Sequence, residues 1–208
     1  MSALPKKDQK YTYTEYKKWD LNEGERFELI YGEAFAMSAP NARHQEILME
    51  IAGQFHAYLK GKPCKVYPAP FDVRLFYRED GYDDTVVQPD ITIVCDEKKR
   101  GHEGCRGAPD LVIEILSPTN TAIEMERKLR LYQDAGVQEY WIVDPENKSI
   151  NVYRFKISSI ESQETRNTEA QDKKLAGAIL SYTYEKDASV PVGIFPDLQI
   201  SMEQVFAE

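Results

Sequence analysis

The chain has 208 residues and a formal net charge of −9. This length suits one ordinary domain with a real core rather than two domains. The negative charge argues against a protein that coats duplex nucleic acid through a general positive field, because such binding depends on many neutralised phosphates. Any contact with nucleic acid would therefore be local or assisted by a metal ion.

The sequence contains no apolar run near the roughly 20 residues of a membrane span, and its polar start lacks the apolar core of a signal peptide. No membrane partner is expected. The three cysteines, Cys64, Cys95 and Cys105, are odd in number and fit no CxxC spacing. The pattern therefore predicts neither a disulfide framework nor a zinc site, and it favours a reducing, cytoplasmic location.

The N-terminal part begins with a polar stretch, residues 1–12, that we expect to be a loose tail ahead of a single domain over residues 13–208. A short capped helix is expected from Thr14, followed by two strands in ERFELIYGEAFAM that meet at Gly32. Glu28 alternates with apolar residues on the first of these strands. A solvent-facing edge is the favoured interpretation, with a functional role as the alternative.

Residues 41–60 place Ile47, Leu48, Ile51, Phe55 and Leu59 at helical spacing and predict an amphipathic helix. His44 lies on the same stripe near the start of this helix. It is either an ordinary packing residue or a group that handles a metal shell, a phosphate or a proton.

Two segments between the helices are expected to be irregular. Residues 78–84 form an acidic, turn-rich connection after two short strands, and its aspartates, Asp80, Asp83 and Asp84, are interpreted as solvated. Residues 96–108 are basic, rich in glycine and without periodicity, so they are interpreted as a surface loop. That loop holds a concentrated positive patch in an otherwise acidic chain, formed by Lys98, Lys99, Arg100 and Arg106.

Two apolar strands each carry one carboxylate. In VVQPDITIVCD the alternation places Asp90 in the middle of a strand, and in DLVIEILSP it places Glu114 between apolar neighbours. A carboxylate that loses its hydration costs several kcal/mol or has a raised pKa unless a cation or hydrogen bonds compensate. Either a divalent metal shared with Asp90 or the ammonium of Lys128 would supply that charge.

Thr121 and Glu124 form a capping box, so a helix is predicted from Ala122 to a stop at Gly136. Lys128 lies at the border of the buried stripe of this helix. An i, i+4 pair with Glu124 is the alternative partner, although the cap competes for that carboxylate.

The C-terminal part predicts a strand in EYWIVDP and a return strand in NKSINVYRF. Residues 156–174 are polar, without apolar periodicity, and are expected to be a mobile loop. A strand near residues 178–184, a connection over residues 190–196 and a short helix after Ser201 complete the chain.

Asp90, Glu114 and Lys128 together suit phosphodiester hydrolysis, which needs a divalent metal held by acids and a positive group near the attacking water and the phosphate. The same three side chains could equally form a buried ion-pair network. Two carboxylates held close together repel each other without a cation, which favours the metal.

The chain also resembles the Uma-two family of the PD-(D/E)xK nuclease superfamily over residues 13–155. The resemblance is carried by an ordered series of segments: FELIYGE, ARHQE, QPDITIV, PDLVIEILSP, KLRLYQDAGVQEYW and IVDPE. It implies an α/β, restriction-endonuclease-like fold, with a mixed central sheet flanked by helices and β additions at both ends. It further implies Mg²⁺, with Mn²⁺ as an alternative ion, held by Asp90 and Glu114, and by superfamily analogy the carbonyl of Ile115.

The usual superfamily lysine stands two residues after the second acid, where this chain has Leu116. In the Uma-two pattern the lysine comes from the following helix, which corresponds to Lys128. His44 and Glu28 also match family positions and are secondary candidates, whereas Glu124 stands where aspartate is more usual.

The function implied is a metal-dependent endonuclease, acting most simply on DNA and as a homodimer, because cleavage of two strands suits two related sites. A non-catalytic interaction or regulatory module that keeps the nuclease fold is the alternative.

Overall fold

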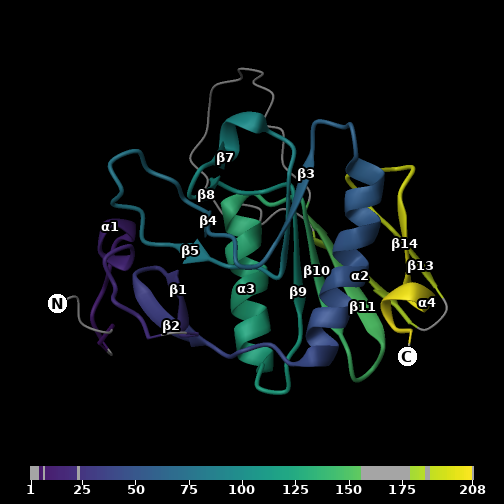
Figure 1. Cartoon of the computed structure of the whole chain (residues 1–208), viewed down its shortest axis with the longest axis horizontal. Helices are drawn as coiled ribbons and strands as arrows, with labels where there is room; N and C mark the ends of the chain where they lie inside the picture. The colour runs from purple at the N-terminus through teal and green to yellow at the C-terminus, as the bar shows by residue number, and fades with distance from the viewer. Residues whose placement is uncertain (1–4, 7, 23, 156–178, 186–187, 208) are drawn as a thin grey trace, which may run out of the picture.

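The computed structural model describes residues 5–6, 8–22, 24–155, 179–185 and 188–207 (Figure 1). The loop predicted over residues 156–174 lies outside the described residues. Part of the predicted N-terminal tail is anchored: Tyr11 is buried, packs edge-on against Trp19 and donates its N–H to the carbonyl of Gly32. In the described part of the chain, no helix has both the length and the apolarity that crossing a membrane would require.

The larger sheet has six strands in the order β12-β11-β10-β9-β6-β3. Its strands are β3 (Lys65–Pro68), β6 (Ile91–Val94), β9 (Leu111–Ile115), β10 (Glu139–Asp144), β11 (Ser149–Phe155) and β12 (Ile179–Tyr184). β9 and β10 run parallel, while the other neighbours in this sheet are antiparallel. β6 and β9 are buried along their whole length, because helices cover both faces of the sheet at this point.

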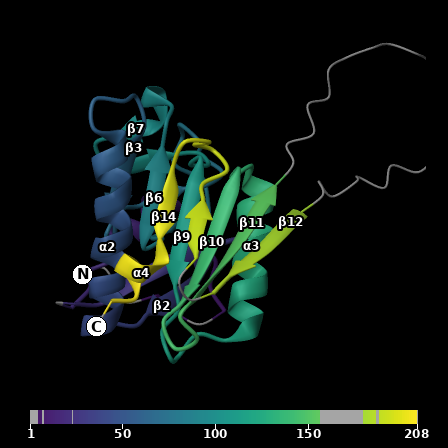
Figure 2. The same cartoon turned by 90° about the vertical axis from the view of Figure 1, so that its right-hand side faces the viewer.

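Helices α2 (Ala42–Leu59) and α3 (Ala122–Ala135) cover opposite faces of this sheet (Figure 2). The apolar stripe of α2 packs with Ile91, Ile93, Leu111, Ile113 and Trp141 of the sheet. The C-terminal hairpin of β13 (Ser189–Pro191) and β14 (Gln199–Ser201) and the short helix α4 (Met202–Val205) join the same cluster. Each fully buried aliphatic side chain contributes about 1.5–3 kcal/mol, so this face fixes the position of α2.

On the opposite face, Leu131 and Tyr132 of α3 pack in one cluster with Val112, Tyr140 and Ile142 of the sheet. The helix begins at the predicted capping box, in which Thr121 accepts from the N–H of Glu124 and Glu124 accepts from the N–H of Thr121. It ends at Gly136, whose φ of 89° is a left-handed conformation that glycine adopts without strain. The boundaries predicted for this helix are confirmed.

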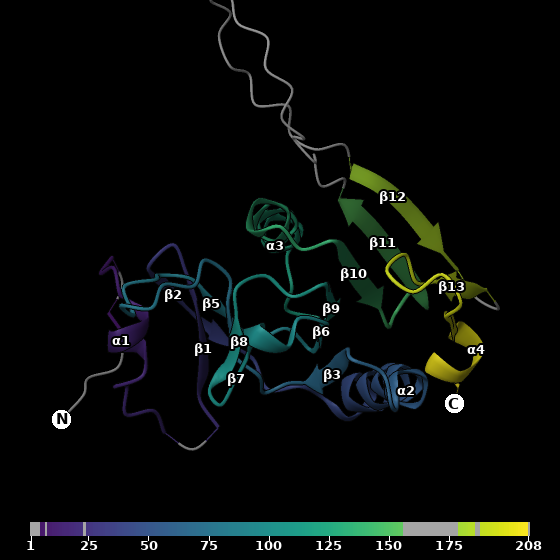
Figure 3. The ribbon, with the colours of Figure 1, turned by 90° about the horizontal axis from the view of Figure 1, so that it is seen from above.

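A second six-stranded sheet lies beside the first (Figure 3) and has the order β2-β1-β5-β4-β8-β7. Its strands are β1 (Arg26–Ile30), β2 (Glu33–Met37), β4 (Val73–Arg74), β5 (Val86–Val87), β7 (Arg100–Gly101) and β8 (Gly104–Arg106). Helix α1 (Tyr13–Tyr16) packs against it through Tyr13, in a cluster with Leu29 and Val86. The two sheets and their covering helices confirm the predicted mixed α/β fold and the predicted β1–β2 hairpin.

Three segments that the sequence predicts to be irregular form ordered structure. Residues 96–108 form a 3₁₀ turn, η1 (Glu97–Lys99), and the β7–β8 hairpin instead of a loop, because β8 pairs in parallel with β4. Asp83 is buried and not solvated, since it forms an ion pair with Arg74. The predicted connection over residues 190–196 overlaps the last two residues of β13, which pairs with β14.

The prediction of no disulfide is wrong. Cys64 and Cys95 form a disulfide between the start of β3 and the end of β6, because the antiparallel pairing of Lys65 with Val94 brings the next pair of residues together. Cys105 is a free, buried thiol. The cytoplasmic location thus loses its support from the cysteines and stays a prediction.

Candidate active site

A pocket of about 460 Å³ opens where the two sheets meet the starts of α2 and α3. One wall is the face of the β1–β2 hairpin that carries Arg26, Glu28 and Ile30. The opposite wall comes from α3 and from the segment that follows β9. The lining residues include all five side chains singled out in the sequence: Glu28, His44, Asp90, Glu114 and Lys128.

Glu114 lies on β9, opposite Ile142 of β10, and its side chain is 10% exposed. Its Oε1 accepts hydrogen bonds from Nζ of Lys128 at 2.8 Å and from the hydroxyl of Tyr132 at 2.6 Å. Burial raises the pKa of Glu114 to about 7, and the neighbouring charges of Glu28 and Asp90 act in the same direction, against the pull of Lys128. The carboxylate predicted to be buried is therefore buried, and a cation compensates it.

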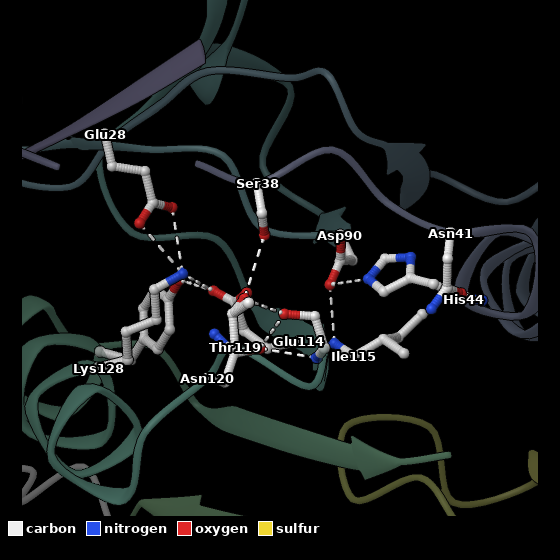
Figure 4. Close-up of polar contacts among 12 residues, drawn as sticks. Glu28, Ser38, Asn41, His44, Asp90, Glu114, Ile115, Thr119, Asn120 and Lys128 are labelled. Carbon is white, nitrogen blue, oxygen red and sulfur yellow. Dashed lines mark hydrogen bonds and ion pairs between the residues drawn. The ribbon is translucent and has the colours of Figure 1, made fainter. Parts of the chain in front are cut away.

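Lys128 projects from α3 toward two carboxylates (Figure 4), Glu114 and Glu28, with its Nζ 3.1 Å from Oε2 of Glu28. Burial alone would lower the pKa of this lysine, but the two carboxylates outweigh burial and raise it. Lys128 is therefore charged. The alternative i, i+4 pair with Glu124 does not form, because Glu124 caps the helix at Thr121.

Glu28 is 5% exposed, so the favoured interpretation of a solvent-facing strand residue is wrong. The hairpin turns the face that carries Arg26, Glu28 and Ile30 toward the pocket rather than toward water. Oε1 of Glu28 also accepts from the N–H of Gln88 at 3.0 Å. Two donors thus hold the carboxylate in place.

Asp90 lies just before β6, and not in the middle of one long strand as predicted. The chain leaves the smaller sheet after β5 and enters the larger sheet at Ile91, and Pro89, which has no N–H, interrupts the ladder between them. Oδ2 of Asp90 accepts from the N–H of Ile115 at 2.7 Å, which ties it to the end of β9. Asp90 therefore sits at the junction of the two sheets.

His44 lies in the first turn of α2, where Asn41 caps the helix by accepting from the His44 N–H at 2.8 Å. Its Nε2 is 3.3 Å from Oδ2 of Asp90. Burial lowers the pKa of His44, but the hydrogen bond and charge of Asp90, together with the backbone of Ile115, raise it above its usual range. Nδ1 is buried without a hydrogen-bond partner among the described residues.

The site thus has two linked halves. Glu28, Lys128 and Glu114 form one half, and His44, Asp90 and the backbone of Ile115 form the other (Figure 4). The sequence did not single out Tyr132, whose hydroxyl donates to Glu114. Its position four residues after Lys128, on the same helical face, was the available signal.

The donor set suits a hard divalent cation. The described residues contain no group of three or more His, Cys, Asp or Glu side chains that could hold a metal ion. Mg²⁺, however, is commonly bound through one or two carboxylates, with water and substrate phosphate as its other ligands. Glu28 and Glu114 both contact the single ammonium of Lys128, so an added cation beside Asp90 and Glu114 would offset the carboxylate charge that Lys128 leaves uncompensated.

Comparisons with known proteins identify the fold and the family of this chain. A crystal structure of "a putative nuclease belonging to DUF820" from Anabaena variabilis superposes on this chain with a TM-score of 0.67. The two sequences are 22% identical, and the match covers 95% of this chain and 98% of that one. This match confirms the predicted restriction-endonuclease-like fold. "Uncharacterized protein slr1290" of Synechocystis is 26% identical over 140 residues, which cover 67% of this chain and 71% of that protein. The model of the Uma2 family, described as "Putative restriction endonuclease", matches residues 13–183, and the chain belongs to this family.

Proposed function

We propose that this protein is a metal-dependent endonuclease that hydrolyses phosphodiester bonds in nucleic acid, with DNA as the substrate. The observation that carries the proposal is the convergence of three carboxylates and one charged lysine in one pocket. A purely structural ion pair would need one acid for each base, whereas Glu28 and Glu114 both contact the single ammonium of Lys128, so a divalent cation shared with Asp90 would neutralise the extra carboxylate.

The roles follow from position. Asp90, Glu114 and the carbonyl of Ile115 would hold Mg²⁺, with Mn²⁺ as an alternative ion. When bound, the ion supplies Lewis-acid stabilisation of the charge that develops on the phosphodiester. Lys128 contributes a fixed positive charge beside the same phosphate, and Glu28 positions that ammonium through its 3.1 Å contact. His44, held by Asp90, orients a phosphate oxygen or the attacking water.

The first test is calorimetric titration of Mg²⁺ and Mn²⁺ into the wild type and into Asp90→Ala and Glu114→Gln, with folding checked by circular dichroism. We expect the wild type to bind and both variants to lose binding while they stay folded. Glu50→Gln is the matched control, because Glu50 is an exposed carboxylate on α2. Variants that bind the ion as well as the wild type does would contradict the assignment of these ligands.

The second test is a cleavage panel of single-stranded and double-stranded DNA and RNA with Mg²⁺ or Mn²⁺. Cleavage of DNA by the wild type, lost in Asp90→Ala, is the expected result. Metal binding without cleavage of any of these forms would instead favour an interaction module that keeps the fold.

We also propose that the protein acts as a homodimer, since cutting both strands of a duplex suits two sites related by two-fold symmetry. β12 forms an edge of the larger sheet, and Ile179, Leu180 and Tyr182 leave about 40% of their surface exposed there. Analytical ultracentrifugation should give twice the chain mass for the wild type and the chain mass for Tyr182→Lys. A wild type with the mass of one chain would rule out the dimer.

A further inference from the structure

Two arginines line the same pocket and form no ion pair with a carboxylate in the described part of the chain. Arg26 comes from β1 and Arg127 from α3, so they belong to opposite walls. Within the described residues, neither side chain has an ion pair within 4.0 Å, although the chain carries a net charge of −9 and the pocket's Lys128 and His44 are both paired with carboxylates. An arginine is normally held by a carboxylate or a phosphate when it lines a recess.

Arg26 is half-buried at the start of β1, opposite Met37 of β2. Because side chains alternate along a strand, Arg26 lies on the same face as Glu28 and Ile30, and all three line the pocket. Glu28 has Lys128 and Gln88 as its partners. The charge of Arg26 is therefore left facing the pocket.

Arg127 precedes Lys128 on α3 and is also half-buried. Its guanidinium carbon lies 4.1 Å above the ring of Phe35, which comes from the β1–β2 hairpin and lines the same pocket. Its Nε is buried without a hydrogen-bond partner among the described residues. Stacking on a ring fixes the plane of the guanidinium and leaves its N–H groups available to an anion.

We propose that Arg26 and Arg127 form an anion subsite that holds a phosphodiester group next to the scissile one along a nucleic acid strand. This inference rests on the proposed function, because it places the strand in the pocket that contains Asp90 and Glu114. The planar guanidinium matches the geometry of a phosphate through two parallel hydrogen bonds. A local pair of cations also explains how an acidic protein contacts a polyanion without a general positive field.

The experiment measures binding of a fluorescent single-stranded DNA oligonucleotide by anisotropy in EDTA, where no cleavage interferes, over a series of salt concentrations. The variants are Arg26→Ala, Arg127→Ala and Arg127→Lys. Arg130→Ala is the matched control, because Arg130 lies one turn further along α3, is exposed and pairs with Glu126 at 2.6 Å. Calorimetric titration of Mg²⁺ into each variant checks that the metal ligands are intact.

We expect Arg26→Ala and Arg127→Ala each to weaken binding about tenfold and to reduce the salt dependence by about one released counterion. Arg127→Lys should keep the salt dependence and lose part of the affinity, because lysine keeps the charge without the paired donors. Arg130→Ala should bind like the wild type, and all variants should bind Mg²⁺.

Two results would overturn the subsite, and they are distinguishable. If the wild type binds and cleaves DNA while Arg26→Ala and Arg127→Ala bind it as tightly as Arg130→Ala does, the subsite is wrong and the nuclease function stands. If the wild type binds no oligonucleotide in EDTA and cleaves none with Mg²⁺, the subsite and the proposed function fail together.

Discussion

At the scale of single residues, Lys128 shares its charge between two buried carboxylates, Glu28 and Glu114. Removing one member of a buried ion pair leaves an uncompensated charge, which usually costs more than the intact pair contributes. We also propose a catalytic role for Lys128, so its replacement should lower both the stability of the fold and the cleavage activity. Adding a metal ion separates the two effects.

For Lys128→Met, we expect the metal-free protein to lose about 3–5 kcal/mol of unfolding free energy and nucleic acid cleavage to be abolished. Mg²⁺ should raise the melting temperature of this variant more than that of the wild type, because the ion replaces part of the missing positive charge. Thermal unfolding with and without Mg²⁺ measures this. Lys60→Met, at an exposed position after α2, is the control. Equal stability of Lys128→Met and the wild type would show that Glu28 and Glu114 do not depend on this ammonium.

The second residue-scale prediction concerns Asp83, which accepts from Nε of Arg74 at 2.8 Å and is 2% exposed. Arg74 also stacks 3.8 Å over the ring of Tyr13 and so joins the acidic connection to α1. Asp83→Asn should destabilise the fold by about 3–5 kcal/mol in urea unfolding, because Arg74 stays buried without its counter-charge. Asp80→Asn, in an exposed pair with Arg78, should give no measurable change. An unfolding free energy of Asp83→Asn equal to that of the wild type would indicate that this carboxylate is solvated, as the sequence predicts.

At the scale of elements, the parts predicted well are those with strong local signals. The start and end of α3 could be read from a capping box and a glycine, and α2 from a five-residue apolar stripe. β7, β8, β13 and β14 have two or three residues each, too few to show a periodic pattern, and they are defined by the strands with which they pair. A pattern within one short segment carries no information about such pairing.

The site shows the same division. Asp90, Glu114 and Lys128 could be selected from the sequence because two of them interrupt apolar runs and the third borders a helical stripe. The crossing of the chain between sheets at Pro89 and the inward turn of Glu28 depend on tertiary packing. The spacing of residues along one element does not contain these facts.

The prediction at this scale concerns the start of α3, where Thr121 and Glu124 satisfy each other's backbone N–H groups. Thr121→Ala should cost about 1 kcal/mol in urea unfolding, because the first turn loses one of its cap acceptors. Thr121→Ser keeps the hydroxyl and should behave like the wild type. Equal losses for both variants would indicate that packing of the threonine methyl, rather than the cap, stabilises this turn.

At the scale of the whole molecule, the two sheets meet where β6 begins, and β6 is also the strand that the Cys64–Cys95 disulfide joins to β3. β3 is an edge strand of the larger sheet and is paired on one side by β6. A cross-link over 31 residues restricts the unfolded chain, which in the entropy model stabilises the fold by about 3–4 kcal/mol. The disulfide would therefore hold the edge strand β3 against β6, the strand that begins directly after Asp90.

The disulfide and the state of Cys105 can be tested together by counting thiols with Ellman's reagent. Burial raises the pKa of Cys105 to about 12, so at pH 8 its thiol is protonated and shielded, and the native protein should react slowly or not at all. Denaturation without reductant should expose one thiol, and denaturation after reduction should expose three. Reduction should also lower the unfolding free energy by about 3–4 kcal/mol, an effect that Cys64→Ser should reproduce. Three thiols in the denatured, unreduced protein would contradict the disulfide and would agree with the reduced cysteines that the sequence pattern predicts.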